Sequence, residues 1–332
     1  MMDYTIFKEV VREKLAEYLP EKLQGAEFMI RSVNKINTQH DEIIFPVEGE
    51  FVTSAVELND MYEEYVACED LEKVLWGMKE KLETSMQAIP DIRHAMTPEY
   101  ARRNIYFQLI NTEQNKKLLQ NIPNRPYQDL SVIYRLHIGE QGDKMASMII
   151  NNYVAETDFG LPEEQLFALA KENTKRMFPP EIKSLNELVK EMMLADGVSP
   201  EYVDMVVGNV EPEQDLWVLT NQSRKYGASF LLYEDQLQEI AQKLGTDLYI
   251  LPSSIHETLA APVSLGNPAE LAEMVAEVNR EKVALSERLS NQVYHYDRNK
   301  RELSLATDTP DKRLDQMENC HKETVPLKTY GR

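Results

Sequence analysis

Four side chains that can transfer protons or attack electrophiles fall within one short segment, residues 252–257. They are Ser253, Ser254, His256 and Glu257. A nucleophilic serine needs a base within hydrogen-bond reach, and that base needs an acid to orient it. The segment supplies all three residue types. It also follows an apolar stretch, 248–251, that we predict to be a strand, and loops after strands often carry function in α/β proteins.

The close spacing of these residues argues against a catalytic triad, because known triads draw on separated segments. The chain contains no G-x-S-x-G elbow. A zinc-protease motif also fails, because position 260 is alanine where a second histidine would be needed. Two interpretations stay open. The segment is either a Ser/Pro turn with structural hydrogen bonds, which such segments more often are, or a hydrolase-like site built from the serines, His256 and Glu257.

Three further residues are candidates for ligand binding. Tyr226 and Ser229 belong to a polar turn, 221–229, between two predicted strands, and a hydrolase-like site at 252–257 could recruit them. In the same turn we expect Gly227 to adopt an unusual backbone conformation. His295 lies among aromatic and charged residues at 294–298, which either line a groove or end a strand.

Metal and cofactor motifs are missing from the sequence, so we expect neither a metal nor a cofactor. No two of the six histidines are three or four residues apart, and neither glycine-rich phosphate-binding motif occurs. The two cysteines, Cys68 and Cys320, are too far apart for a CxxC knuckle. Their small number favours a reducing, cytoplasmic compartment. No apolar run approaches the roughly 18 residues of a membrane span, and the start lacks a signal-peptide pattern.

The charge distribution is strongly acidic. The net charge is −20, and residues 151–250 hold 18 acidic and eight basic residues, a net of −10. Direct nucleic-acid binding is therefore not expected, because it depends on clustered lysine and arginine. The acidic segment would instead suit a basic partner protein. Six basic residues of the middle region form either a local patch or scattered solvated charges: Arg102, Arg103, Lys116, Lys117, Arg125 and Arg135.

The elements that position these residues predict an α+β fold with mixed sheets. Apolar residues at helical spacing predict helices over 4–18, 69–84, 161–178, 184–195, 200–207, 234–244 and 268–289. Strict alternation over 129–138, followed by a polar, glycine-containing stretch at 139–143 and the segment 145–154, predicts an antiparallel hairpin. Residues 228–251 read as a late β-α-β unit. We expect an N-terminal α+β segment 1–95, a hairpin and helical segment 96–210, a C-terminal β-α-β segment 211–306 and a loose polar tail 307–332. In the alternative, 211–306 forms one elaborated domain with the preceding parts.

Several ordered blocks resemble a family of bacterial proteins of unknown function, DUF5688. They include QLINTEQNKKLLQNIPNRPYQDLSVIYRL, LPEEQLFALAKENTKRMFPPEI, LTNQSRKYGASFLLYEDQLQEIAQKLGTDLYILPSSIHETLAAP and MVAEVNREKVALSERLSNQVYHYDR. The resemblance covers most of residues 25–305 and implies no catalytic residues. It implies a weak association with mobile-element genes.

These observations give two functional hypotheses of different classes. The first is a non-enzymatic, cytoplasmic, acidic binding or accessory protein with a basic partner, linked to mobile-element biology. A variant of it has the acidic face mimic nucleic acid. The second is the hydrolase-like enzyme that uses the 252–257 segment.

Overall fold

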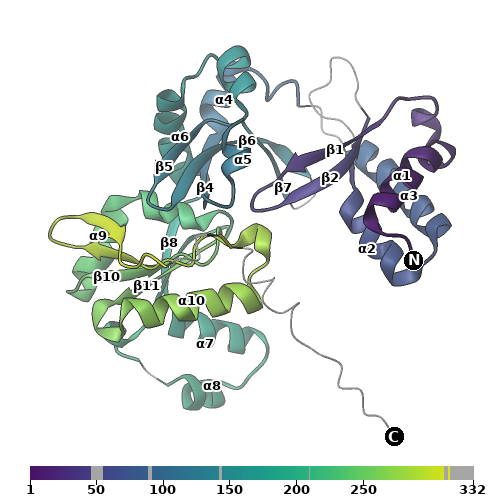
Figure 1. Ribbon diagram of the computed structural model, residues 1–332. Coiled ribbons are helices and arrows are strands. Elements are labelled where there is room, and N and C mark those ends of the chain that lie inside the picture. The colour runs from purple at the N-terminus through teal and green to yellow at the C-terminus, as the bar shows by residue number, and fades with distance from the viewer. Residues whose placement is uncertain (46–54, 89–91, 142–143, 209, 310–312, 315–332) are drawn as a thin grey trace, which may run out of the picture.

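The computed structural model describes residues 1–45, 55–88, 92–141, 144–208, 210–309 and 313–314. It is an α+β structure with an N-terminal lobe, residues 1–88, and a larger body, residues 92–309 (Figure 1). All strand pairs in the described residues are antiparallel, so the expectation of mixed sheets is wrong.

The N-terminal lobe packs helices against a three-stranded sheet of order β1-β2-β3. The predicted first helix is confirmed, and the side chain of Asp3 caps it by accepting the N–H of Ile6 at 2.9 Å. The lobe buries its own apolar core, which includes Phe7, Leu58 and Leu75. Its elements are α1 (Tyr4–Lys14), η1 (Leu15–Tyr18), η2 (Glu21–Leu23), β1 (Met29–Asn34), β2 (Gln39–Ile44), β3 (Ala55–Glu57), α2 (Leu58–Cys68) and α3 (Leu71–Ala88).

The first part of the body is built on a four-stranded sheet in which the long strand β6 pairs with three others. The predicted hairpin is confirmed as β6 and β7. One face of this sheet, which carries Phe107 and Tyr134, packs into the body core. The elements are α4 (Pro98–Asn104), β4 (Ile105–Asn111), α5 (Lys116–Leu119), β5 (Asn124–Tyr127), β6 (Leu130–Gln141), β7 (Lys144–Ile149), η3 (Val154–Asp158) and α6 (Glu163–Met177).

The second part of the body is a six-stranded sheet of order β13-β12-β10-β11-β9-β8. The last two strands, β12 and β13, pair with each other in antiparallel fashion. The strands are β8 (Pro180–Ser184), β9 (Trp217–Asn221), β10 (Leu248–Leu251), β11 (Thr258–Pro262), β12 (Tyr294–Asp297) and β13 (Glu302–Leu305). The helices are α7 (Leu185–Ala195), α8 (Pro200–Val207), η4 (Pro212–Gln214), η5 (Gly227–Leu232), α9 (Glu234–Leu244), η6 (Val263–Leu265), α10 (Pro268–Lys282) and η7 (Leu285–Glu287).

The predicted β-α-β unit over 228–251 is wrong in its first strand. Residues Gly227–Leu232 form the buried 3-10 helix η5, because a short apolar run suits a buried helical turn as well as a strand. The helix α9 then joins β9 to β10, and β11 lies between these two strands and is antiparallel to both. β9 and β10 therefore run in the same direction, but they are not neighbours in the sheet and form no parallel pair.

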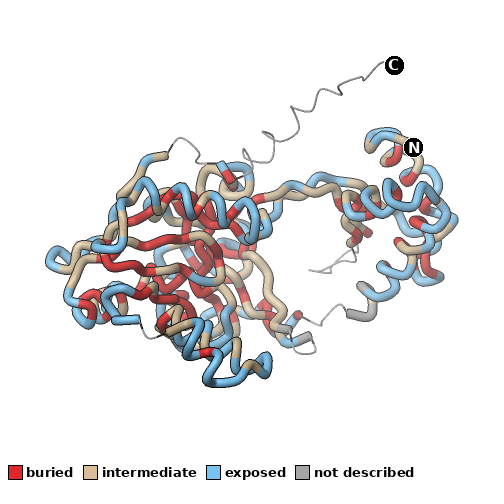
Figure 2. The backbone as a smooth tube through the Cα atoms, turned by 90° about the horizontal axis from the view of Figure 1, so that it is seen from below, coloured by how far each residue is buried: buried red, intermediate tan, exposed pale blue. Residues whose placement is uncertain are grey.

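Buried backbone follows the strands of the body, and a second buried region lies in the N-terminal lobe (Figure 2). The body core draws on residues from Ile92 to Tyr296 and so includes both sheets. The division of the chain at 95 and 210 stays a prediction. The predicted tail, 307–332, falls almost entirely outside the described residues.

Asn37 ties the lobe to the body through several hydrogen bonds. Asn37, at the turn between β1 and β2, is 3% exposed and has a φ of 61°. Its side-chain amide donates to the carbonyl oxygens of Leu285 (2.8 Å) and Arg288 (2.6 Å). Its backbone N–H donates to Oδ1 of Asn115 at 2.7 Å, and Nδ2 of Asn115 donates back to its Oδ1 at 2.7 Å. The β1–β2 hairpin is thereby held against the body.

Candidate functional site

The 252–257 loop connects β10 to β11 and is pinned along the segment 287–290. The N–H of Ile255 donates to the carbonyl of Glu287 at 2.9 Å, and the N–H of Leu289 donates to the carbonyl of Ser253 at 3.0 Å. Inside the loop, the hydroxyl of Ser254 accepts the N–H of His256 at 3.0 Å. Ser254 is buried and Glu257 is exposed. The loop therefore has the hydrogen bonds of a structured turn.

The imidazole of His256 is engaged at both nitrogens. Nδ1 accepts the backbone N–H of Tyr226 at 3.4 Å, and Nε2 lies 3.4 Å from Oε1 of Glu287. In the neutral ring this arrangement puts the hydrogen on Nε2, because Nδ1 is the acceptor. Among the described residues, neither serine hydroxyl of the loop bonds to the ring. The acid beside His256 is thus Glu287, which the sequence alone did not suggest.

Gly227 lets the Tyr226 turn approach the loop. A Cβ atom at this position would lie 2.2 Å from the carbonyl oxygen of His256 and 2.3 Å from Oγ1 of Thr220. The expected unusual backbone conformation falls instead on its neighbours, since Arg224 has a φ of 52° and Tyr226 one of 55°. The sequence prediction was therefore wrong about the conformation of Gly227. The close packing here requires a residue without a side chain at position 227.

A groove of about 640 Å³ runs between the 252–257 loop, α7 and α10, and we call it the α7–α10 groove. The loop contributes all four of its candidate residues to the rim, and Glu287 lies beside them. The walls are mostly apolar. They include Leu185, Leu188, Val189, Met192, Val278 and Val283. The geometry therefore places the predicted polar residues beside an apolar trough, which suits binding of an amphipathic ligand.

Met192 of the groove wall belongs to α7, and α7 and α8 carry further exposed apolar side chains. No residue of α7 is buried, and Val203 is the only buried residue of α8. Met205 is 72% exposed and Met192 is 60% exposed. We call this the α7–α8 surface and define it by Met192, Leu194, Tyr202, Met205 and Val206. The sequence pattern predicted both helices but could not reveal that their apolar side chains are exposed.

The side chains of the two remaining candidates bond to other parts of the body. The hydroxyl of Ser229 is buried in η5 and donates to the carbonyl oxygen of Phe107 at 3.3 Å. His295 lies on β12, where its Nε2 is 3.3 Å from Oδ2 of Asp247. Of the six basic residues of the middle region, Arg125 pairs with Glu163 at 2.8 Å, and whether the six form a patch stays a prediction.

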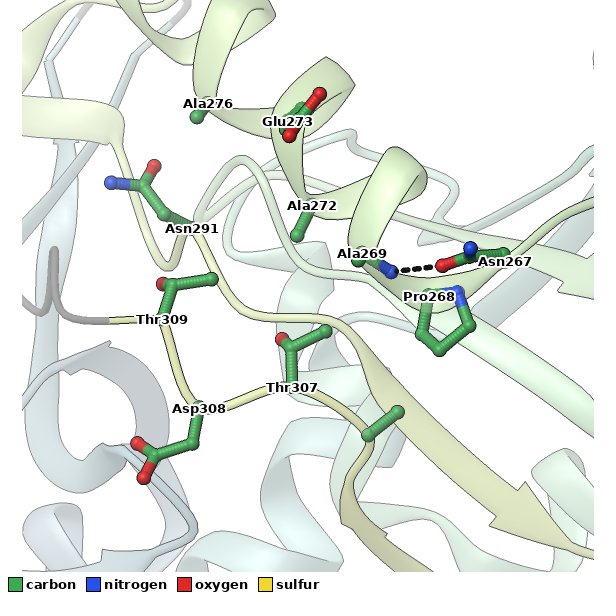
Figure 3. A pocket seen from close by; sticks show the side chains of 11 residues that line it. Asn267, Pro268, Ala269, Ala272, Glu273, Ala276, Asn291, Thr307, Asp308 and Thr309 are labelled. Atoms are coloured by element: carbon green, nitrogen blue, oxygen red, sulfur yellow. Dashed lines mark hydrogen bonds between the residues drawn. The ribbon is translucent and has the colours of Figure 1, made fainter.

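A further cavity of about 510 Å³ lies under the N-terminal part of α10 (Figure 3). Its lining contains small side chains such as Ala272 and Ala276, with Thr307 on the facing segment. Asn267 caps the helix there by accepting the N–H of Ala269 at 2.8 Å. None of the candidate residues predicted from the sequence lines this cavity.

Comparison with known proteins gives a family but no relative of known function. Neither the curated proteins nor the solved structures contain a match. No helix among the described residues is long and apolar enough to cross a bilayer. The same residues contain no group of three or more side chains placed to hold a metal ion. The resemblance noted from the sequence is confirmed: a family model matches residues 4–298, and the chain belongs to DUF5688, a family of unknown function.

Proposed function

We propose that this protein is an accessory protein that binds a basic, amphipathic segment of a partner protein. The binding region is the α7–α8 surface together with the adjoining α7–α10 groove. We place this role in the cytoplasm, as expected from the scarcity of cysteine. The expected link to mobile elements makes DNA-handling proteins, which carry basic surfaces, the first partners to examine.

The exposed apolar side of α7 and α8 is the observation that carries this proposal. A helix on the surface of a globular protein normally buries its apolar stripe against the core. Here Met192, Met205 and Val206 are each more than half exposed. Large exposed apolar side chains gathered on neighbouring helices favour a site of protein interaction. Methionine side chains are flexible and polarizable, and such surfaces adapt to helical ligands.

The charges around this surface favour a basic partner. Residues 185–213 contain seven carboxylates and one basic residue, Lys190, which lies 3.8 Å from Asp204. All seven carboxylates are exposed: Glu187, Glu191, Asp196, Glu201, Asp204, Glu211 and Glu213. A ligand with lysines or arginines on one face and apolar residues on the other would satisfy both features.

Two alternatives receive less support from the geometry. A mimic of nucleic acid needs negative charge but has no use for exposed methionines. A serine hydrolase needs a hydroxyl that donates to the base. In the described loop, however, Ser254 accepts the N–H of His256, and the ring of His256 faces Tyr226 and Glu287.

The proposal is tested with a fluorescent peptide of about 18 residues, five helical turns, in which lysine and leucine form an amphipathic helix. We expect saturable binding by fluorescence anisotropy that weakens between about 50 and about 300 mM salt. The double variant Met192→Ser/Met205→Ser should bind at least about tenfold more weakly. Met29→Ser is the matched control, because Met29 is an exposed methionine of the N-terminal lobe.

Two results would overturn the proposal. One is equal binding of a scrambled peptide of the same composition, because binding would then depend on charge alone and not on an amphipathic helix. The other is wild-type affinity in the Met192/Met205 double variant.

A further inference from the structure

A cavity of about 820 Å³ lies between the N-terminal lobe and the body, and we call it the interlobe cavity. The β1–β2 hairpin reaches from the lobe to the body beside β6 and β7 (Figure 1). The lobe contributes His40 and Glu57 to the lining. The body contributes Gln108, Arg135, Tyr226, Ile255, His256 and Glu287.

The floor of this cavity is the second face of the four-stranded sheet. Side chains alternate along a strand, so Gln108 points away from the body core to which its neighbours Phe107 and Leu109 belong. Arg135 pairs with Tyr106 on one side and with Ile149 on the other, so its side chain shares the face of Gln108. Strand register therefore brings a guanidinium and an amide to the same floor.

Both side chains can donate further hydrogen bonds. Gln108 is fully buried, and its Oε1 accepts from Nη1 of Arg135 at 3.3 Å. Its Nε2 is buried and has no partner among the described residues. Arg135 donates to Oγ of Ser147 at 3.0 Å and lies over the Tyr226 ring at 5.3 Å. No carboxylate forms an ion pair with Arg135 in the described part of the chain. Buried donors are nearly always satisfied, so an unpaired one at a cavity indicates a missing acceptor.

Tyr226 provides a second, independent indication. Its φ of 55° lies in the left-handed region, which large side chains rarely adopt, and such strain gathers at ligand sites. Its ring lies near both the Arg135 guanidinium and the His256 imidazole, whose centroid is 6.1 Å away. The strained backbone thus holds an aromatic ring at the wall of the cavity.

We propose that the interlobe cavity binds a small molecule through an oxyanion group, a carboxylate or a phosphate. The group accepts from Arg135 and from Nε2 of Gln108, and a planar or apolar part of the molecule packs near Tyr226 and Ile255. The two carboxylates of the lining, Glu57 and Glu287, do not take the position proposed for the oxyanion. Glu57 lies 3.8 Å from His40, and Glu287 lies 3.4 Å from His256. Charge-assisted hydrogen bonds to a guanidinium are strong and directional, which suits a selective site.

The test uses benzoate and phenyl phosphate as probes, with benzamide as the neutral analogue of the same shape. We expect at least one of the two anions to bind saturably by isothermal titration calorimetry and to raise the melting temperature, while benzamide does neither. The anion that binds better identifies the oxyanion that the site takes. Failure of both anions, or equal binding of benzamide, would overturn the proposal.

Variants place the binding in this cavity. Gln108→Leu and Arg135→Met should each weaken binding of the anion by about tenfold or more. Arg102→Met removes the same charge from an exposed position on α4 and should leave binding unchanged. Gln108→Leu should change the melting temperature of the free protein little. It removes a buried amide nitrogen that has no partner among the described residues, at the loss of one 3.3 Å hydrogen bond from Arg135. Wild-type affinity in a folded Gln108→Leu or Arg135→Met protein would contradict the assignment.

Discussion

Gly227 is the residue whose substitution should have the clearest structural effect. Replacing it with alanine places a Cβ atom 2.2 Å from the backbone oxygen of His256, and backbone cannot rotate away as a side-chain tip can. We expect Gly227→Ala to lower the free energy of unfolding by about 1–3 kcal/mol, as overpacking does. The measurement is urea denaturation.

The matched control for this substitution is Gly77→Ala. Gly77 lies within α3, and the nearest atom to an added Cβ is Oε2 of Glu64 at 3.8 Å. Alanine is favoured over glycine in a helix by about 1 kcal/mol, so stability should rise or stay level. Equal behaviour of the two variants would show that the close approach at Gly227 is unimportant.

The His256 ring gives a second prediction at the scale of the residue. Both of its nitrogens face groups other than a serine hydroxyl. We therefore expect wild type and His256→Ala to show the same background rates with p-nitrophenyl acetate and p-nitrophenyl phosphate. Turnover by the wild type that disappears in His256→Ala would restore the hydrolase hypothesis.

At the scale of the element, Asp41 ties β2 to α1. Its carboxylate accepts from Nζ of Lys8 at 2.7 Å and from the hydroxyl of Tyr4 at 2.9 Å. The hydrogen bond from Lys8 is the largest cause that holds the pKa of Asp41 below its usual value. A carboxyl group whose pKa is lower in the folded than in the unfolded protein stabilises the fold at pH values above its unfolded pKa, about 3.9. This stabilisation is lost as the pH falls through the folded pKa.

The variant Asp41→Asn should therefore lose about 1–2 kcal/mol of stability at pH 7 and little at pH 2. Thermal denaturation across that pH range measures the difference. The control is Glu63→Gln, which changes an exposed carboxylate on α2. The account of Asp41 fails if the two variants show the same pH dependence.

Helices and their caps were largely predictable from the sequence because their signals are local. Asp3, Ser184 and Asn267 cap helices that the apolar spacing already indicated, and each accepts a backbone N–H in the structure. The segment 228–233 was not predictable in the same way, because a short apolar run does not separate a strand from a buried 3-10 turn. Sheet order depends on distant pairings, so β11 could not be placed between β9 and β10.

At the scale of the whole molecule, Asn37 should control how the lobe sits on the body. Asn37→Gly keeps a residue that accepts a φ of 61° but loses the side-chain hydrogen bonds, and Asn37→Ala loses both advantages. We expect amide hydrogen exchange in the β1–β2 hairpin to rise in the order wild type, Asn37→Gly, Asn37→Ala. Unchanged exchange in both variants would rule out this role.

The interlobe cavity also explains why the sequence revealed only part of the candidate sites. The alternation in β6 put Arg135 on the face opposite Tyr134, and the 252–257 segment drew attention to His256. The cavity that Gln108 lines, however, is bounded by a hairpin whose tip meets Asn115 and Arg288 far along the chain. Spacing along the sequence carries no signal for such a contact.

The central claim is that the α7–α8 surface receives a basic amphipathic helix. The most direct measurement is hydrogen–deuterium exchange of the protein with and without the lysine–leucine peptide. The account predicts slower exchange in the peptide-bound protein over α7, α8 and the facing part of α10 around Val278, and no change in the N-terminal lobe. Protection that lies elsewhere, or no protection at a saturating peptide concentration, would contradict it.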